Sequence, residues 1–139
     1  MQEINFDEAL EQILARDARY TREAYLFVRE ALDYTQRLAG KETRGAIRHV
    51  TGRELLDGIR QFALNQFGPM AVTVFEEWGV HSCRDFGEIV FNMVEIGLLA
   101  KTEKDTRDDF QNGYDFTEAF RKPFWPSQKL SPVSKPEAE

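Results

Sequence analysis

The stretch over residues 67–99 constrains the fold of this chain more than any other. Two segments with helical spacing of apolar residues flank Gly79, and Pro69 stands where a helix begins, a position that tolerates its missing N–H. The spacing predicts a short helix over 69–78 and a second, very apolar helix over 83–96, joined by a tight turn. This stretch is therefore expected to form a helix-turn-helix.

Three further helices are predicted upstream. Their ranges are 6–16, 20–38 and 52–67. Thr51 and Glu54 have the spacing of a capping box, in which each side chain satisfies a backbone N–H of the other end. The first 67 residues are thus expected to be helical, apart from short connections.

Apolar residues recur three or four positions apart between Tyr20 and Leu38. Such a stripe either packs on the core of its own chain or forms a seam with a second chain, giving a homodimer. The stripe is short for a coiled coil, which favours the core-facing interpretation and leaves monomer and homodimer both open. Gly40 is expected to end this helix in a left-handed conformation.

The segment that follows the apolar helix indicates extended structure. Residues 98–102 are expected to form a strand, and 110–116 to return beside it as a strand or an irregular connection. Three helices followed by two strands over residues 51–116 is the order of elements in a winged helix. The expected fold class is therefore mainly α, a helical domain with a helix-turn-helix or winged-helix-like C-terminal half and one short β-hairpin.

The domain organisation follows from the same patterns. Residues 1–120 are expected to form a single helical domain, of which 1–39 are an N-terminal helical pair. Residues 121–139 are rich in proline and are expected to be a largely disordered tail. Within the tail, Phe124 and Trp125 are bulky aromatic residues and are expected to dock on the body of the domain.

The charge balance disfavours binding to nucleic acid, because the net charge is −6 and such binding depends on neutralising phosphates. Residues 40–60 are an exception, with five basic and three acidic side chains. A hypothetical anion or nucleic-acid contact there would use Lys41, Arg44, Arg48, His49 and Arg53. The other interpretation is a solvated linker whose arginines pair with the acidic 20–38 helix. A third hypothesis is an enzyme or ligand site centred on His49.

Four polar residues of the 83–96 helix fall on one face, which is predicted to be exposed: Arg84, Glu88, Asn92 and Glu95. A helix that reads DNA presents basic and amide side chains to the groove. Two carboxylates on this face are unfavourable beside phosphates. The face is therefore predicted to contact another protein.

Other candidate sites carry little chemistry. Cys83 is the single cysteine, which excludes an internal disulfide and fits a reducing cytosol. With His81 it offers only two zinc ligands, and its position near a helix start suggests either a lowered thiol pKa or a small buried residue. The acidic turn of Glu103, Asp105, Asp108 and Asp109 does not match a calcium loop. No catalytic residue, cofactor or metal is predicted, and no apolar run is long enough for a membrane helix.

Several short segments together resemble a family of uncharacterised bacterial proteins of similar length. They are Asp17–Tyr20, Glu23–Val28, His49–Gly52, Glu54–Gly58, Phe67–Ala71, Trp78–Val80 and Asp85–Phe91. The resemblance implies a bacterial cytoplasmic protein and no particular activity. The expected function is a non-enzymatic protein-interaction or regulatory module. The alternatives are a nucleic-acid-binding regulator and an enzyme or ligand-binding protein.

Overall fold

The computed structural model describes residues 5–42, 50–99, 108–111 and 113–126. These residues are mainly helical, as the sequence predicts, and contain no strand. The α-helices are α1 (Phe6–Arg16), α2 (Arg22–Glu42), α3 (Gly52–Phe67), α4 (Ala71–Glu77), α5 (Cys83–Glu95) and α6 (Asp108–Gln111). Shorter helical turns are η1 (Gly68–Met70), η2 (Thr117–Arg121, a π-helical turn) and η3 (Lys122–Phe124).

Most helix boundaries follow from their capping residues. The Asn5 side chain accepts hydrogen bonds from the first turn of α1, and the capping box of Thr51 and Glu54 at α3 is confirmed in both directions. Gly68 has φ 53° after α3, and Gly79 has φ 87° after α4. The prediction that Gly40 ends its helix is wrong, since α2 continues to Glu42 and this glycine lies inside it.

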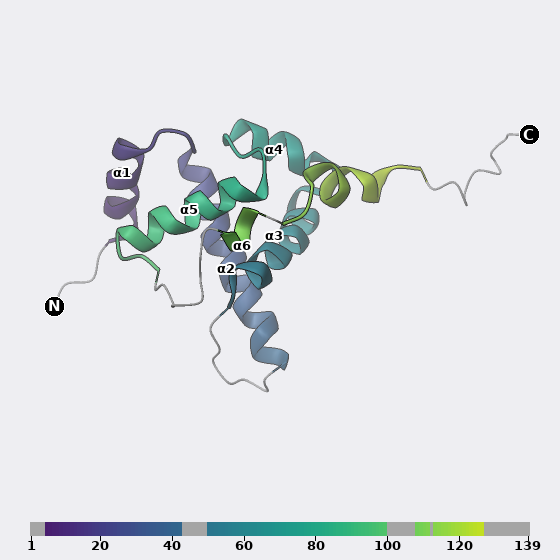
Figure 1. Ribbon diagram of the computed structural model, residues 1–139, viewed down its shortest axis with the longest axis horizontal. Coiled ribbons are helices and arrows are strands. Elements are labelled where there is room, and N and C mark those ends of the chain that lie inside the picture. The colour runs from purple at the N-terminus through teal and green to yellow at the C-terminus, as the bar shows by residue number, and fades with distance from the viewer. Residues whose placement is uncertain (1–4, 43–49, 100–107, 112, 127–139) are drawn as a thin grey trace, which may run out of the picture.

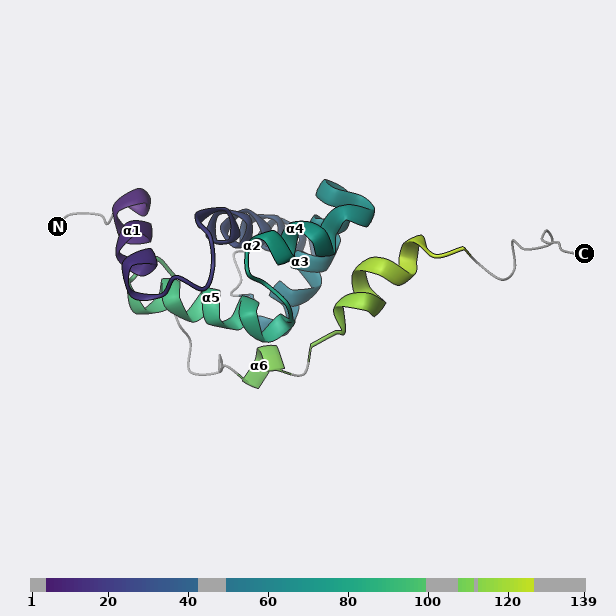
Figure 2. The same cartoon turned by 90° about the horizontal axis from the view of Figure 1, so that it is seen from above.

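The helices form a body with two distinct ends. Helices α2 and α3 pack along each other, and α5 crosses them (Figure 1). Helix α1 lies at one end of the molecule, and η2 and η3 lie at the opposite end in both views (Figures 1 and 2). The α2–α3 crossing is close because Gly58 of α3 sits directly against Thr35 of α2.

Aromatic rings fill the centre of the core. Phe75 of α4 is completely buried, and its ring centroid lies 5.2–6.4 Å from those of six other aromatic residues: Phe27, Phe67, Trp78, Phe86, Phe116 and Phe120. These residues come from α2, α3, α5, the α4 terminus and the C-terminal segment. One cluster therefore joins nearly every part of the described chain.

The apolar stripe between Tyr20 and Leu38 faces this core. Tyr20, Ala24, Phe27 and Ala31 are all buried. These four side chains therefore face the core of their own chain, against α3, α4 and α5, while Tyr34 and Leu38 further along the stripe are partly exposed.

The predicted β-hairpin and winged helix are not supported. After α5 the chain turns at Gly97 (φ 88°), and the Leu98 N–H donates to the Met93 carbonyl, so this stretch is a helix C-cap. Phe110 lies in α6 and packs on Gly87 of α5 instead of joining a strand. The apolar residues that suggested strands are core contacts of a turn and a single helical turn; residues 100–102 lie outside the described part.

The described part of the proline-rich segment also differs from the prediction. Lys122–Phe124 form a helical turn that continues η2. Phe124 is 46% exposed and Trp125 is 55% exposed, so the prediction that both dock on the body is wrong. Both residues are about half exposed and belong to the C-terminal segment, which lies at the end of the molecule opposite α1 (Figure 2).

The α2–α3 crossing provides a matched pair of glycine variants. A Cβ built at Gly58 lies 2.9 Å from Thr35 Cβ and overlaps its hydroxyl, which is buried and bonded to Ala31 O, whereas a Cβ at Gly40 has nothing within 4 Å. Gly58→Ala should lower the free energy of unfolding by about 1–3 kcal/mol, and Gly40→Ala should raise it by about 0.5–1 kcal/mol. Urea denaturation measures both changes.

The double variant Gly58→Ala with Thr35→Ala removes the overlapping hydroxyl and should recover part of the lost unfolding free energy. If Gly58→Ala is as stable as the unmodified protein, the two helices do not cross at this distance.

Candidate functional site

The four residues of the predicted protein-contact face have different surroundings. Arg84 and Glu95 are exposed, as predicted. Glu88 and Asn92, between them, are only partly exposed. The middle of this face is therefore covered, and the covering segment is the connection between α1 and α2.

A polar network fastens that connection to α5. The Asn92 amide donates to Asp17 Oδ2 and to the Tyr25 hydroxyl, both at 3.0 Å. Arg19 forms ion pairs with Asp17 at 2.7 Å and with Glu88 at 3.3 Å. Because Arg19 and then Asn92 donate to its carboxylate, the pKa of Asp17 lies well below its usual range. This network has an internal structural role that the spacing along one helix does not reveal.

The basic 40–60 segment is described only in part. Arg44, Arg48 and His49 lie outside the described residues, and the Lys41 side chain does too. Arg53 is exposed in the first turn of α3. At that helix start, the Thr51 hydroxyl already accepts from Glu54 N–H. The anion or nucleic-acid contact and the His49-centred site stay predictions.

The predicted acidic turn also falls outside the described residues. Glu103 and Asp105 are not described at all, and the side chains of Asp108 and Asp109 are not described. Among residues 5–42, 50–99, 108–111 and 113–126, no group of three His, Cys, Asp or Glu side chains is arranged to hold a metal ion.

Cys83 is a buried residue. Its thiol donates to the Tyr114 carbonyl oxygen at 3.4 Å, and burial raises its pKa to about 11. A lowered thiol pKa is therefore wrong, and a small buried residue is the correct interpretation. The neighbouring His81 side chain is exposed.

A groove of about 550 Å³ opens to solvent in the described surface. It is larger than two other hollows, of about 200 and 240 Å³, that border α1 and the α2–α3 crossing. Its lining residues are Val72, Glu76, Val80, His81, Ser82, Tyr114, Asp115, Phe116, Thr117, Arg121 and Trp125. One wall is α4 with the α4–α5 turn, and the other is the 114–125 segment.

The carboxylate of Asp85 helps to hold the α4–α5 wall in place. Asp85 accepts a hydrogen bond from the His81 N–H at 2.8 Å and another from the Tyr20 hydroxyl at 2.6 Å. Ser82 occupies the N-cap position of α5, but its side chain makes no capping bond. At the turn itself, a Cβ on Gly79 would clash with the Arg19 carbonyl oxygen, so only glycine allows this approach.

The 114–125 wall is anchored at its start. The Tyr114 hydroxyl donates to the Leu56 carbonyl at 2.7 Å. Gly113 lies so close to Cys83 and Leu56 that a Cβ there would be within 3.0 Å of both. The Asp115 carboxylate accepts from Glu118 N–H at 3.1 Å and caps the turn that follows. Both walls are thus fixed by contacts with the helical body.

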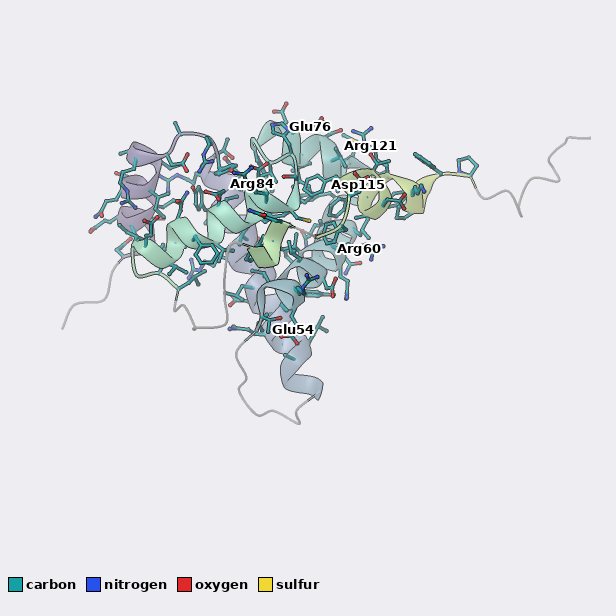
Figure 3. The ribbon with its side chains drawn as sticks, viewed as in Figure 1. Glu54, Arg60, Glu76, Arg84, Asp115 and Arg121 are labelled. Carbon is teal, nitrogen blue, oxygen red and sulfur yellow. The ribbon has the colours of Figure 1, made fainter. Side chains whose placement is uncertain are left out.

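Charged and aromatic side chains surround the groove. Glu76 projects from α4, whereas Arg121 of η2 and Asp115 belong to the 114–125 wall (Figure 3). Within the described residues neither Glu76 nor Arg121 has an ion-pair partner. The Lys122 ammonium lies 5.9 Å from the centre of the exposed Trp125 ring. The groove therefore offers an exposed indole and charges of both signs.

Sequence reasoning missed this groove because its walls are about forty residues apart in the chain. The available signal was Trp125, a large aromatic residue flanked by prolines, with Arg121 one helical turn before it.

Asp17 should make the protein sensitive to acid. Its folded pKa is depressed, so its contribution to stability is complete above about pH 5 and declines as the pH falls through the unfolded value of about 3.9. Asp17→Asn should therefore lower the unfolding free energy at pH 7 and flatten its decline below pH 4. Urea denaturation over this pH range checks the slope; equal slopes for the two proteins would contradict the role of Asp17.

Cys83 should react slowly in the folded protein. A thiol of pKa about 11 is ionised at pH 8 to roughly one part in a thousand, against about a quarter for an unperturbed cysteine. Alkylation by iodoacetamide, followed by mass spectrometry, should be at least ~100-fold slower in the native protein than in urea. Similar rates would show that the Tyr114 contact opens readily.

Comparisons with known proteins add no identification. Protein-family models, curated proteins and solved structures were each searched, and none matches this chain. The described helices include none with the length and apolar content needed to cross a membrane. The geometry of the groove therefore provides the basis for a functional proposal.

Proposed function

We propose that this chain is a non-enzymatic protein-interaction module of the bacterial cytosol, and that it binds protein through the groove between α4 and the 114–125 segment. The observation that carries the proposal is Trp125, an indole 55% exposed at a groove of about 550 Å³ whose walls are fixed. Tryptophan and arginine are the residues most enriched where binding energy concentrates in protein interfaces, and Arg121 lies on the same groove.

Apolar side chains extend the surface around the groove. Met70, Phe124 and Trp125 are three of the four large hydrophobic residues that are exposed in the described part, the fourth being Leu26 on α2. Met70 belongs to η1, which packs against η2, and η3 continues η2. Exposed apolar side chains therefore gather at one end of the molecule, as they do at protein-binding surfaces.

The polar groups of the groove favour binding over catalysis. Tyr114 and Asp115 are used to hold the wall, through hydrogen bonds to Leu56 and Glu118. Within the described residues no hydrogen bond joins Ser82 to His81, so the lining lacks the paired nucleophile and base of an acyl-transfer site.

The proposed contact surface is the groove and not the exposed face of α5 that the sequence predicts. There, Asn92 and Glu88 already contact Asp17 and Arg19, which leaves Arg84 and Glu95 as separated exposed charges. The groove supplies what that face lacks, an exposed aromatic group beside a hollow.

Site-specific cross-linking tests the proposal. A photoreactive amino acid at Thr117, an exposed residue of the groove, should give a defined protein adduct in bacterial cells that produce the chain. Adding Trp125→Ala should reduce the adduct at least ~10-fold, because the indole supplies much of the contact energy. Adduct yield on a denaturing gel, with mass spectrometry of the product, measures the effect.

The same photoreactive group at Gln12, exposed on α1 at the opposite end, is the matched control and should give no adduct that depends on Trp125. An adduct that forms equally from both positions, or that survives Trp125→Ala, would count against the groove as a binding site.

A further inference from the structure

The groove contains both members of a knob-and-hollow contact. The Trp125 indole is 55% exposed at its rim, and the buried side chains of Val72, Val80 and Phe116 lie behind the hollow. A partner that fits the groove must supply a group that enters the hollow and a surface that covers the indole. The same patch on a second copy of this chain offers both.

The charged side chains of the groove can likewise pair with those of a second copy. Glu76 lies on one wall and Arg121 on the other, both are exposed, and neither has an ion-pair partner within the described residues (Figure 3). In a contact with two-fold symmetry, residue i of one copy meets residue j of the other and the reverse contact also forms. One carboxylate and one guanidinium on the same patch therefore make two identical ion pairs across such an axis.

We infer that the groove binds a second copy of this chain, in a two-fold dimer in which Arg121 of each copy pairs with Glu76 of the other and the Trp125 rings are buried between them. The inference rests on the proposed function and names its partner. It also places self-association away from the Tyr20–Leu38 stripe, of which Tyr20, Ala24, Phe27 and Ala31 are buried within one chain.

The net charge opposes this dimer at long range. Each copy carries −6, and at about 0.15 M salt the repulsion is screened beyond roughly 8 Å, so the contact depends on local pairs. Overall repulsion and a local Glu76–Arg121 pair therefore predict opposite effects of one variant. Glu76→Arg lowers the net negative charge and would strengthen association if only overall repulsion mattered, whereas it should weaken association if Glu76 faces Arg121.

The experiment is sedimentation velocity over a wide concentration range with the full chain. Glu76→Arg and Arg121→Glu should each weaken the dimer at least ~10-fold in Kd, because each places like charges together twice. An equimolar mixture of the two variants should associate again, since every cross-chain pair is then opposite in charge. The double variant Glu76→Arg with Arg121→Glu should also dimerise.

Glu30→Arg is the matched control, with the same change of net charge at an exposed position of α2 that does not line the groove; it should not weaken the dimer. Restored association in the mixture also shows that both single variants are folded. A monomeric unmodified chain, or single variants that dimerise normally, would overturn the inference. Cross-linking from Thr117 to a different protein, without self-association, would overturn it while leaving the proposed function intact.

Discussion

The packing of aromatic rings around Phe75, in edge-to-face and tilted pairs, is the contact on which the rest of this structure depends. Its ring is fully buried, and it touches rings from α2, α3, α5 and the C-terminal segment. Aromatic pairs at these distances contribute about 0.5–1.5 kcal/mol each beyond the burial of their surface. Phe116 belongs both to this cluster and to the groove lining. The groove therefore lies directly on the outer surface of the core.

The two ends of the molecule are attached by different forces. At the groove end, apolar rings and the Tyr114 hydrogen bond to Leu56 hold the last segment. At the other end, α1 buries Leu10 and Ile13, and the connection behind it relies on the carboxylate of Asp17. The pKa of Asp17 is depressed in the folded protein, so the second attachment weakens only in strong acid, as this carboxylate becomes protonated.

The helices were predictable from sequence because their signals are local: an asparagine cap before α1, the capping box at Thr51, and Gly68 and Gly79 after α3 and α4. The predicted β-hairpin is not supported, because apolar residues such as Leu98 and Phe110 give the same sequence pattern in a strand as in a turn or a one-turn helix that packs on Gly87. The groove was missed because it depends on two segments meeting across the core. No periodicity within either one encodes that meeting.

The distribution of the groove walls along the chain has a consequence for the order of events during synthesis. Helices α1 to α5 and the floor residue Val80 are complete before the second wall, residues 114–125, is made. Chains are made from the N-terminus, and early segments begin to fold first. A growing chain thus lacks the groove until residues 114–125 have been made and Phe116 and Phe120 can pack on the helical body. The proposed binding surface is therefore completed only after helices α1 to α5.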